Sequence, residues 1–183
     1  FENGGIGIRS NYPYFDEEKE QVVTLEQDIN ECRKKNGEKP LSYYKGGPMA
    51  DISAYMAYTS RGNIINVEIP NNDKAIDAYE MGRKLYFTKV GQLNFSCADC
   101  HVYQTGSKLR ADIPSPGIGH PTHFPAYRSS AGRLVTLHER FAGCLNRVRA
   151  KPFKAQNAEY TNLEYFMTFM SNGLEINGPG SRK

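Results

Sequence analysis

One short run of residues, Cys97-Ala98-Asp99-Cys100-His101, constrains this chain more than any other feature. Two cysteines separated by two residues and followed at once by a histidine have the spacing in which both thiols bond to the vinyl groups of a haem while the imidazole reaches the iron. A zinc site or a redox cysteine pair is the alternative, but zinc needs two further well-placed ligands. The motif therefore predicts one covalently bound haem c, anchored by Cys97 and Cys100, with His101 as an axial ligand of the metal.

Two amphipathic segments flank this motif and predict helices that enclose the haem. Residues 73–89 and 159–170 place apolar side chains every three or four positions. Gly82 would let the two helices cross closely, and Tyr86, Phe166 and Phe169 would fill the crossing. This arrangement resembles a class I cytochrome c domain. Haem attachment of this kind implies an exported chain, so the expected location is periplasmic.

Length, composition and charge exclude several classes of protein. The 183 residues are 39% hydrophobic and 23% charged, which is typical of a folded chain and not of a disordered one. No run of about 18 uncharged apolar residues occurs, so no membrane-spanning segment is predicted. The formal charge is −5 up to residue 80 and +8 after it. The basic half is too dilute for a nucleic-acid surface, but it suits a small anion or an acidic protein partner.

The interval between the haem motif and the last predicted helix lacks the methionine that serves as second axial ligand in common electron-carrying cytochromes. It offers three histidines and one cysteine as good iron ligands: His120, His123, His138 and Cys144. The first two histidines lie in a Gly-Pro-rich loop, where histidines also line a haem edge or bond a propionate. Water is a further alternative for the sixth coordination site.

A predicted helix favours Cys144 among these ligands. Thr136 and Glu139 have capping-box spacing, so a helix is expected from this point to about residue 150. Cys144 lies on its apolar face, which should look toward the haem, whereas His138 lies off that face. Arg140, one turn before Cys144, would lower the pKa of the thiol and hold an oxyanion at the sulfur. The alternative is that Cys144 is an inert, buried small side chain.

Part of the chain repeats. Residues 12–32 match residues 124–144 at an offset of 112, and residues 52–56 match residues 163–167 at an offset of 111. The predicted fold is therefore mostly α, with two cytochrome-c-like (class I) units related by an internal repeat. Residues 1–70 would form a degenerate N-terminal unit and residues 71–183 the haem-binding cytochrome c domain. The first unit is expected to be truncated at its N-terminus and haem-free, because the counterpart of its haem motif projects upstream of Phe1.

The two repeats differ at the positions that matter for chemistry. Asp28 takes the place of Arg140 and would repel an anion, so the reaction is expected in the second unit. Cys32 takes the place of Cys144. It would be half of a disulfide to an upstream cysteine, which is the favoured interpretation, or the ligand of a haem whose anchor lies outside the sequence.

Motifs spread over nearly the whole chain carry a resemblance to one family. They are residues 25–33 (LEQDINECR), 60–62 (SRG), 91–94 (GQLN), 119–122 (GHPT) with 127–128 (YR), and 140–144 (RFAGC). In these motifs the chain resembles the SoxA family, the A subunits of the SoxAX cytochromes of bacterial thiosulfate oxidation. In lacking a first haem motif, the chain resembles the single-haem members of that family, in which the N-terminal unit is a scaffold.

The resemblance implies a catalytic pair, with Cys144 as distal haem ligand, in part as a persulfide, and Arg140 as the side chain that holds thiosulfate. It implies an L-cysteine S-thiosulfotransferase that joins thiosulfate oxidatively to a cysteine thiol of a SoxYZ-like sulfur-carrier protein. Two electrons would pass to a small c-type cytochrome subunit of the SoxX type, in a heterodimer. Two alternatives are a thiosulfate dehydrogenase that forms tetrathionate, and an electron carrier whose iron has two histidine ligands.

Overall fold

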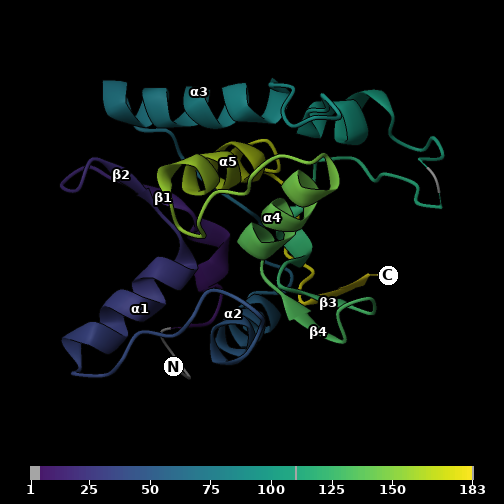
Figure 1. Ribbon diagram of the computed structural model, residues 1–183. Helices are drawn as coiled ribbons and strands as arrows, with labels where there is room; N and C mark the ends of the chain where they lie inside the picture. Colours follow the sequence, from purple (N-terminus) through teal and green to yellow (C-terminus); the bar gives the residue numbers. More distant parts are fainter. Residues whose placement is uncertain (1–4, 110, 183) are drawn as a thin grey trace.

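The computed structural model describes residues 5–109 and 111–182; the ends of the two predicted units, Phe1 to Gly4 and Lys183, lie outside these residues. Within the described part the longer helices are α1 (Leu25–Lys35), α2 (Pro48–Thr59), α3 (Asp73–Phe87), α4 (Leu137–Arg147) and α5 (Ala158–Phe169). Helices dominate, as predicted (Figure 1). None of these helices has the length and apolar character needed to cross a bilayer.

The remaining elements are short. Three-residue strands form β1 (Tyr14–Asp16), β2 (Gln21–Val23), β3 (Ala126–Arg128), β4 (Arg133–Val135) and β5 (Gly180–Arg182), and short helical turns span Ile8–Asn11, Asp99–Tyr103 and Pro121–His123. β1 and β2 form an antiparallel hairpin. β3 pairs antiparallel with β4 and parallel with β5, which gives a three-stranded sheet in the order β4-β3-β5.

The three helices predicted around the haem motif are present, with small shifts at their ends. The segment predicted at 73–89 forms α3, and the one predicted at 159–170 forms α5. The helix predicted to reach about residue 150 forms α4 and ends earlier, at Arg147. It ends there because Arg149 takes a left-handed backbone conformation (φ 59°) and the Ala150 N–H donates to the Leu145 carbonyl oxygen (2.9 Å), as at a glycine C-cap.

Two hairpin–helix segments stand 112 residues apart. β1 and β2 lead through the N-cap Thr24 into α1, and β3 and β4 lead through the N-cap Thr136 into α4, with equivalent strand registers. The caps differ in one respect. Gln27 returns its side chain to the Thr24 N–H (3.0 Å), whereas the Glu139 carboxylate is bound by Arg133 instead. That the two segments belong to two related cytochrome-like units remains a prediction.

The first and second halves of the chain are interleaved. The β1–β2 hairpin packs against α5, whereas β4 lies against α2. One buried apolar cluster joins Phe15 and Val22 from the first half to Ala78 and Tyr165 from the second. Hydrophobic packing therefore continues across position 70, where the boundary between the two units was predicted, and that boundary remains a prediction.

The close crossing predicted at Gly82 is confirmed. α3 runs along the top of the view over α5 (Figure 1), and a Cβ added at Gly82 would overlap the carbonyl oxygen of Asn162 and lie 2.6 Å from its carbonyl carbon. The ring centroids of Tyr79 and Tyr86 each lie 5.4 Å from that of Phe166. This aromatic layer fixes α3 on α5 and so positions the haem motif that follows α3.

Replacing Gly82 by alanine is expected to lower the free energy of unfolding by about 1–3 kcal/mol, because the added Cβ forces two backbones apart. That loss exceeds the ~1 kcal/mol that alanine gains over glycine inside a helix. Gly143→Ala on α4 is the matched control, since a Cβ there meets no heavy atom within 4 Å. Urea unfolding followed by circular dichroism measures both variants, and equal losses in the two would contradict the prediction.

Candidate functional site

The haem motif lies on a turn that the protein fixes by itself. The Asp99 carboxylate accepts a hydrogen bond from the Ser96 N–H (2.8 Å), and the Ser96 hydroxyl oxygen accepts one from the Asp99 N–H (3.0 Å). These hydrogen bonds hold the pKa of Asp99 below its usual value, so the carboxylate is charged and the pair closes the turn from Asp99 to Tyr103. The two hydrogen bonds between Ser96 and Asp99 therefore fix the turn that carries the cysteines and the histidine of the motif.

His101 is held in one tautomer. Its Nδ1 lies 2.8 Å from the Ser115 carbonyl oxygen, which can only accept, so Nδ1 carries the proton and the lone pair of Nε2 is free. Burial lowers the pKa of His101, and the positive charge of Arg140 adds to that effect. A neutral imidazole with a free Nε2 is the form that binds iron.

The cysteines of the motif are partly buried and unpaired. Burial raises the pKa of the Cys97 thiol to about 12, and the neighbouring Cys144 contributes to the shift. The pKa of Cys100 is raised by the same two causes in the same order. The influence of Cys144 on both thiols supports the prediction that α4 turns its sulfur toward the haem motif.

This set of donors fits a haem c. Cys97 packs against the apolar cluster that contains Tyr86 and Phe141, which would supply one wall. The buried Tyr86 hydroxyl has no hydrogen-bond partner in the described residues and lies near both cysteines of the motif. Large apolar side chains are exposed along the segment after the motif: Val102, Tyr103, Leu109, Ile113 and Ile118. An apolar group with polar edges, attached at this turn, would cover such side chains and satisfy such a hydroxyl.

Two guanidinium groups that form no ion pair in the described part of the chain lie near Cys144. Arg140 stands one turn before Cys144 on α4, and β3 carries Arg128. Burial lowers the pKa of Arg128, and the charges of Arg140 and Arg147 lower it further. Within residues 5–109 and 111–182, neither Arg128 nor Arg140 forms an ion pair with a carboxylate, whereas Arg147 reaches Asp112 at 3.4 Å. Positive charge beside a thiol, with no acidic partner, suits a small anion.

Sequence reasoning singled out Arg140 and not Arg128. The two residues are twelve positions apart, and only the pairing of β3 with β4 ahead of α4 brings Arg128 back beside the helix. The sequence signal for Arg128 is a basic residue on a short predicted strand that precedes the helix with the candidate ligand Cys144.

One of the two loop histidines, His120, lies beside His101. The ring centroid of His120 is 4.6 Å from that of His101, edge to face, and its Nε2 lies 2.9 Å from the Ser115 hydroxyl. His123 bonds the Gly119 carbonyl oxygen through Nδ1 (3.1 Å). Burial lowers the pKa of His120 to about 3 and that of His123 to about 4, so both are neutral. Both histidines therefore belong to the loop that contacts His101, whereas Cys144 belongs to α4.

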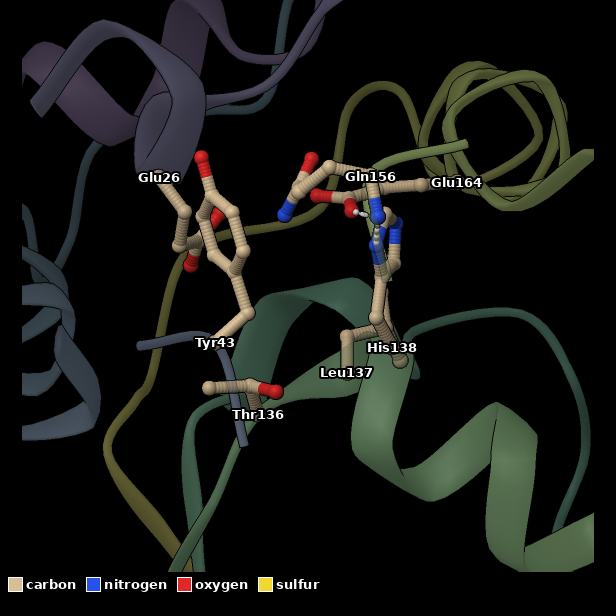
Figure 2. Close-up of a pocket in the computed structure, with 7 residues that line it drawn as sticks. All are labelled: Glu26, Tyr43, Thr136, Leu137, His138, Gln156 and Glu164. Atoms are coloured by element: carbon tan, nitrogen blue, oxygen red, sulfur yellow. Dashed lines mark hydrogen bonds and ion pairs between the residues drawn. The ribbon is translucent and has the colours of Figure 1, made fainter. Parts of the chain in front are cut away.

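His138 lies between side chains of the two halves of the chain (Figure 2). Its Nδ1 accepts a hydrogen bond from the Gln156 N–H (3.1 Å), and its Nε2 lies 3.0 Å from a Glu164 carboxylate oxygen. With Glu26 and Tyr43 opposite, these side chains line a cavity of about 10 Å³. Nδ1 is occupied by the Gln156 N–H and Nε2 faces the Glu164 carboxylate, so His138 is removed from the candidate iron ligands.

The first half carries no equivalent of the Arg140 site among the residues that the structure describes. Asp28, which takes the place of Arg140, accepts hydrogen bonds from the hydroxyls of Tyr12 (2.7 Å) and Tyr14 (3.1 Å). Burial and this carboxylate raise the pKa of both phenols. Cys32 is an exposed free thiol among the described residues, and its predicted disulfide to an upstream cysteine stays a prediction. Where the second half has Arg140, the first half thus has an acidic residue, Asp28, that is hydrogen-bonded by two tyrosine hydroxyls.

Comparison with known proteins shows the family of this chain. Residues 4–65 and 81–176 match the family described as SoxA/TsdA, cytochrome c domain. The chain belongs to this family. The predicted resemblance to SoxA is confirmed: L-cysteine S-thiosulfotransferase subunit SoxA of Allochromatium vinosum is 55% identical over 180 residues, which is 98% of this chain and 64% of that relative. The same subunit of Chlorobaculum tepidum is 54% identical over 183 residues, 100% of this chain and 63% of the relative.

The chain thus spans less than two thirds of the length of these SoxA relatives. Among solved structures, the crystal structure of SoxXA from P. pantotrophus matches with a TM-score of 0.89 and 32% identity, covering 98% of this chain and 66% of that chain. The predicted cytochrome c fold is therefore confirmed by family and by structure, whereas the haem-binding unit at residues 71–183 stays a prediction.

Proposed function

We propose that this SoxA-family chain is the catalytic part of a periplasmic L-cysteine S-thiosulfotransferase. The observation that carries the proposal is a partly buried thiol, Cys144, whose charge acts on both cysteines of the haem motif and on Arg128, and which follows Arg140 by one turn of α4. The names of the SoxA relatives support the same activity. The substrates would be thiosulfate and a cysteine thiol of a SoxYZ-like carrier protein.

The reaction balances as one bond formed and two electrons released. The outer sulfur of thiosulfate bonds to the carrier sulfur, the carrier thiol loses its proton, and the product is a cysteine S-thiosulfonate. The two electrons pass to a small c-type cytochrome subunit of the SoxX type, consistent with the SoxXA complex among the structural relatives.

Different residues of the chain would bind the cofactor and the anion. One haem c would be held by Cys97, Cys100, His101 and Cys144, and it would supply an iron that accepts one electron at a time. Arg140 would hold the thiosulfate oxygens, and Arg128 would lower the free energy of bringing a dianion to a partly buried thiol. Cys144 would carry a persulfide in part of the molecules.

The two halves would then have different roles. Residues 71–183 would form the haem-binding unit, and residues 1–70 a related unit without haem that serves as a scaffold. The matching hairpin–helix segments support this relationship, and the tyrosine-bound Asp28 supports the absence of anion chemistry in the first unit.

Mass spectrometry of the carrier tests the proposal. The holoprotein, its partner cytochrome and thiosulfate are incubated with a thiol-bearing carrier protein, and a thiosulfonate adduct is expected on the carrier cysteine. A carrier whose cysteine is replaced by serine is the control. Tetrathionate formed at the same rate without any carrier would show a thiosulfate dehydrogenase instead, and electron transfer without either product would leave only an electron carrier.

A further inference from the structure

One loop holds His101 from two sides. The Ser115 carbonyl oxygen accepts from His101 Nδ1 (2.8 Å), and the Gly117 N–H donates to the His101 carbonyl oxygen (3.0 Å). Gly117 has no room for a side chain, because a Cβ there would overlap the Tyr86 hydroxyl. The ring and the backbone of the predicted axial ligand are therefore both set by residues 115–117.

The same loop is tied to a rigid helix. The Gly119 N–H donates to the hydroxyl of Ser171 (3.0 Å), which is fully buried and itself bonds the Met167 carbonyl oxygen on α5 (2.8 Å). His120, the next residue, reaches back with Nε2 to the Ser115 hydroxyl (2.9 Å). A continuous path of contacts thus runs from α5 through His120 and Ser115 to His101.

The His120–Ser115 bond fixes an otherwise exposed residue. Ser115 is exposed and stands between two prolines, which limit its backbone but donate no N–H to hold it. In the described residues its hydroxyl has a hydrogen bond only with His120. Backbone hydrogen bonds hold the neighbours of Ser115, since the Gly106 N–H donates to the Pro114 carbonyl oxygen (3.1 Å) and the Gly117 N–H donates to the His101 carbonyl oxygen (3.0 Å). The bond to His120 is therefore the contact by which a side chain fixes Ser115 itself.

We propose that His120 is a positioning residue for the haem: by bonding Ser115 it holds the Ser115 carbonyl against His101 and thereby lowers the reduction potential of the iron. A firm bond from Nδ1–H to a carbonyl makes the opposite nitrogen more basic, and a more basic ligand stabilises ferric over ferrous iron. The inference rests on the haem site and not on the thiosulfate reaction.

The test is the midpoint potential of the purified holoprotein, measured by spectroelectrochemical titration. His120→Leu and Ser115→Ala are each expected to change the ferric-to-ferrous binding ratio about tenfold, an upward shift of about 59 mV for one electron. The double variant should shift no further than the larger single variant, since both remove one bond. Ser107→Ala, an exposed serine of the same loop region, is the control.

Intact mass confirms that the haem is attached in each variant, and electron paramagnetic resonance g-values report the orientation of the axial ring. Potentials of both single variants equal to that of Ser107→Ala would overturn the proposal, as would additive shifts in the double variant. If His120→Leu does not accumulate as holoprotein, Ser115→Ala alone decides, because it keeps the backbone carbonyl and removes only the hydroxyl. Thiosulfonate formation is scored separately, so failure here leaves the proposed reaction standing.

Discussion

Holoprotein carrying Cys144→Ala is expected to lose thiosulfate transfer by a factor on the order of 10³ or more, because the proposed reacting sulfur and distal ligand disappear together. The electron paramagnetic resonance spectrum should change at the same time. Thiolate ligation of low-spin haem gives g-values in a narrow span, and alanine cannot supply that ligand. Both readouts are measured on protein whose haem attachment has been verified by intact mass.

Cys32→Ala is the matched control for this experiment. Cys32 occupies the corresponding position in the first half, is exposed, and lies outside the haem site. Its replacement should leave turnover and g-values unchanged. A Cys144→Ala spectrum identical to the wild type would assign the distal ligand to a loop histidine, and the chain would then be an electron carrier with two histidine ligands.

Arg140→Ala is expected to reduce kcat/KM for thiosulfate by about 10²–10³, comparable to the loss of an oxyanion-stabilising donor. The haem spectrum should remain intact, because Arg140 contributes charge and not a ligand. Arg140→Lys should restore only part of the rate, since an ammonium keeps the charge but not the two-pronged geometry.

The control for charge alone is Arg83→Ala, since Arg83 is exposed on α3 and paired with Glu80 (2.6 Å). Steady-state kinetics at two ionic strengths separates a local contact from long-range attraction, because screening weakens only the latter. Unchanged kcat/KM in Arg140→Ala would remove this residue from the reaction.

The sequence predicted those features that depend on neighbouring residues. The N-cap at Thr136 and the helical periodicity of α3 are local signals, and both are found in the structure. Gly82 was also predictable, because a glycine on the apolar face of a helix leaves room for the backbone of a second helix. The role proposed for Cys144 followed from the lack of a methionine and from its helix face.

Contacts between residues that lie far apart in the sequence were not predictable in this way. Arg128 comes beside Arg140 through strand pairing, and His120 comes beside His101 through a loop whose path depends on two prolines and a glycine. The incomplete cap at Glu139 has a similar cause, since Arg133 across the turn competes for its carboxylate. Single-residue patterns carry no information on such competition.

The interleaving of the two halves has a consequence for how such a chain can change. Phe15 and Val22 cover Tyr165 of α5, so the half that bears the cofactor motif reaches its full buried surface only when the other half is folded beside it. A gene shortened to the second half would leave this surface open to water and prone to aggregation. Selection for solubility can therefore preserve the first half for the surface that it covers.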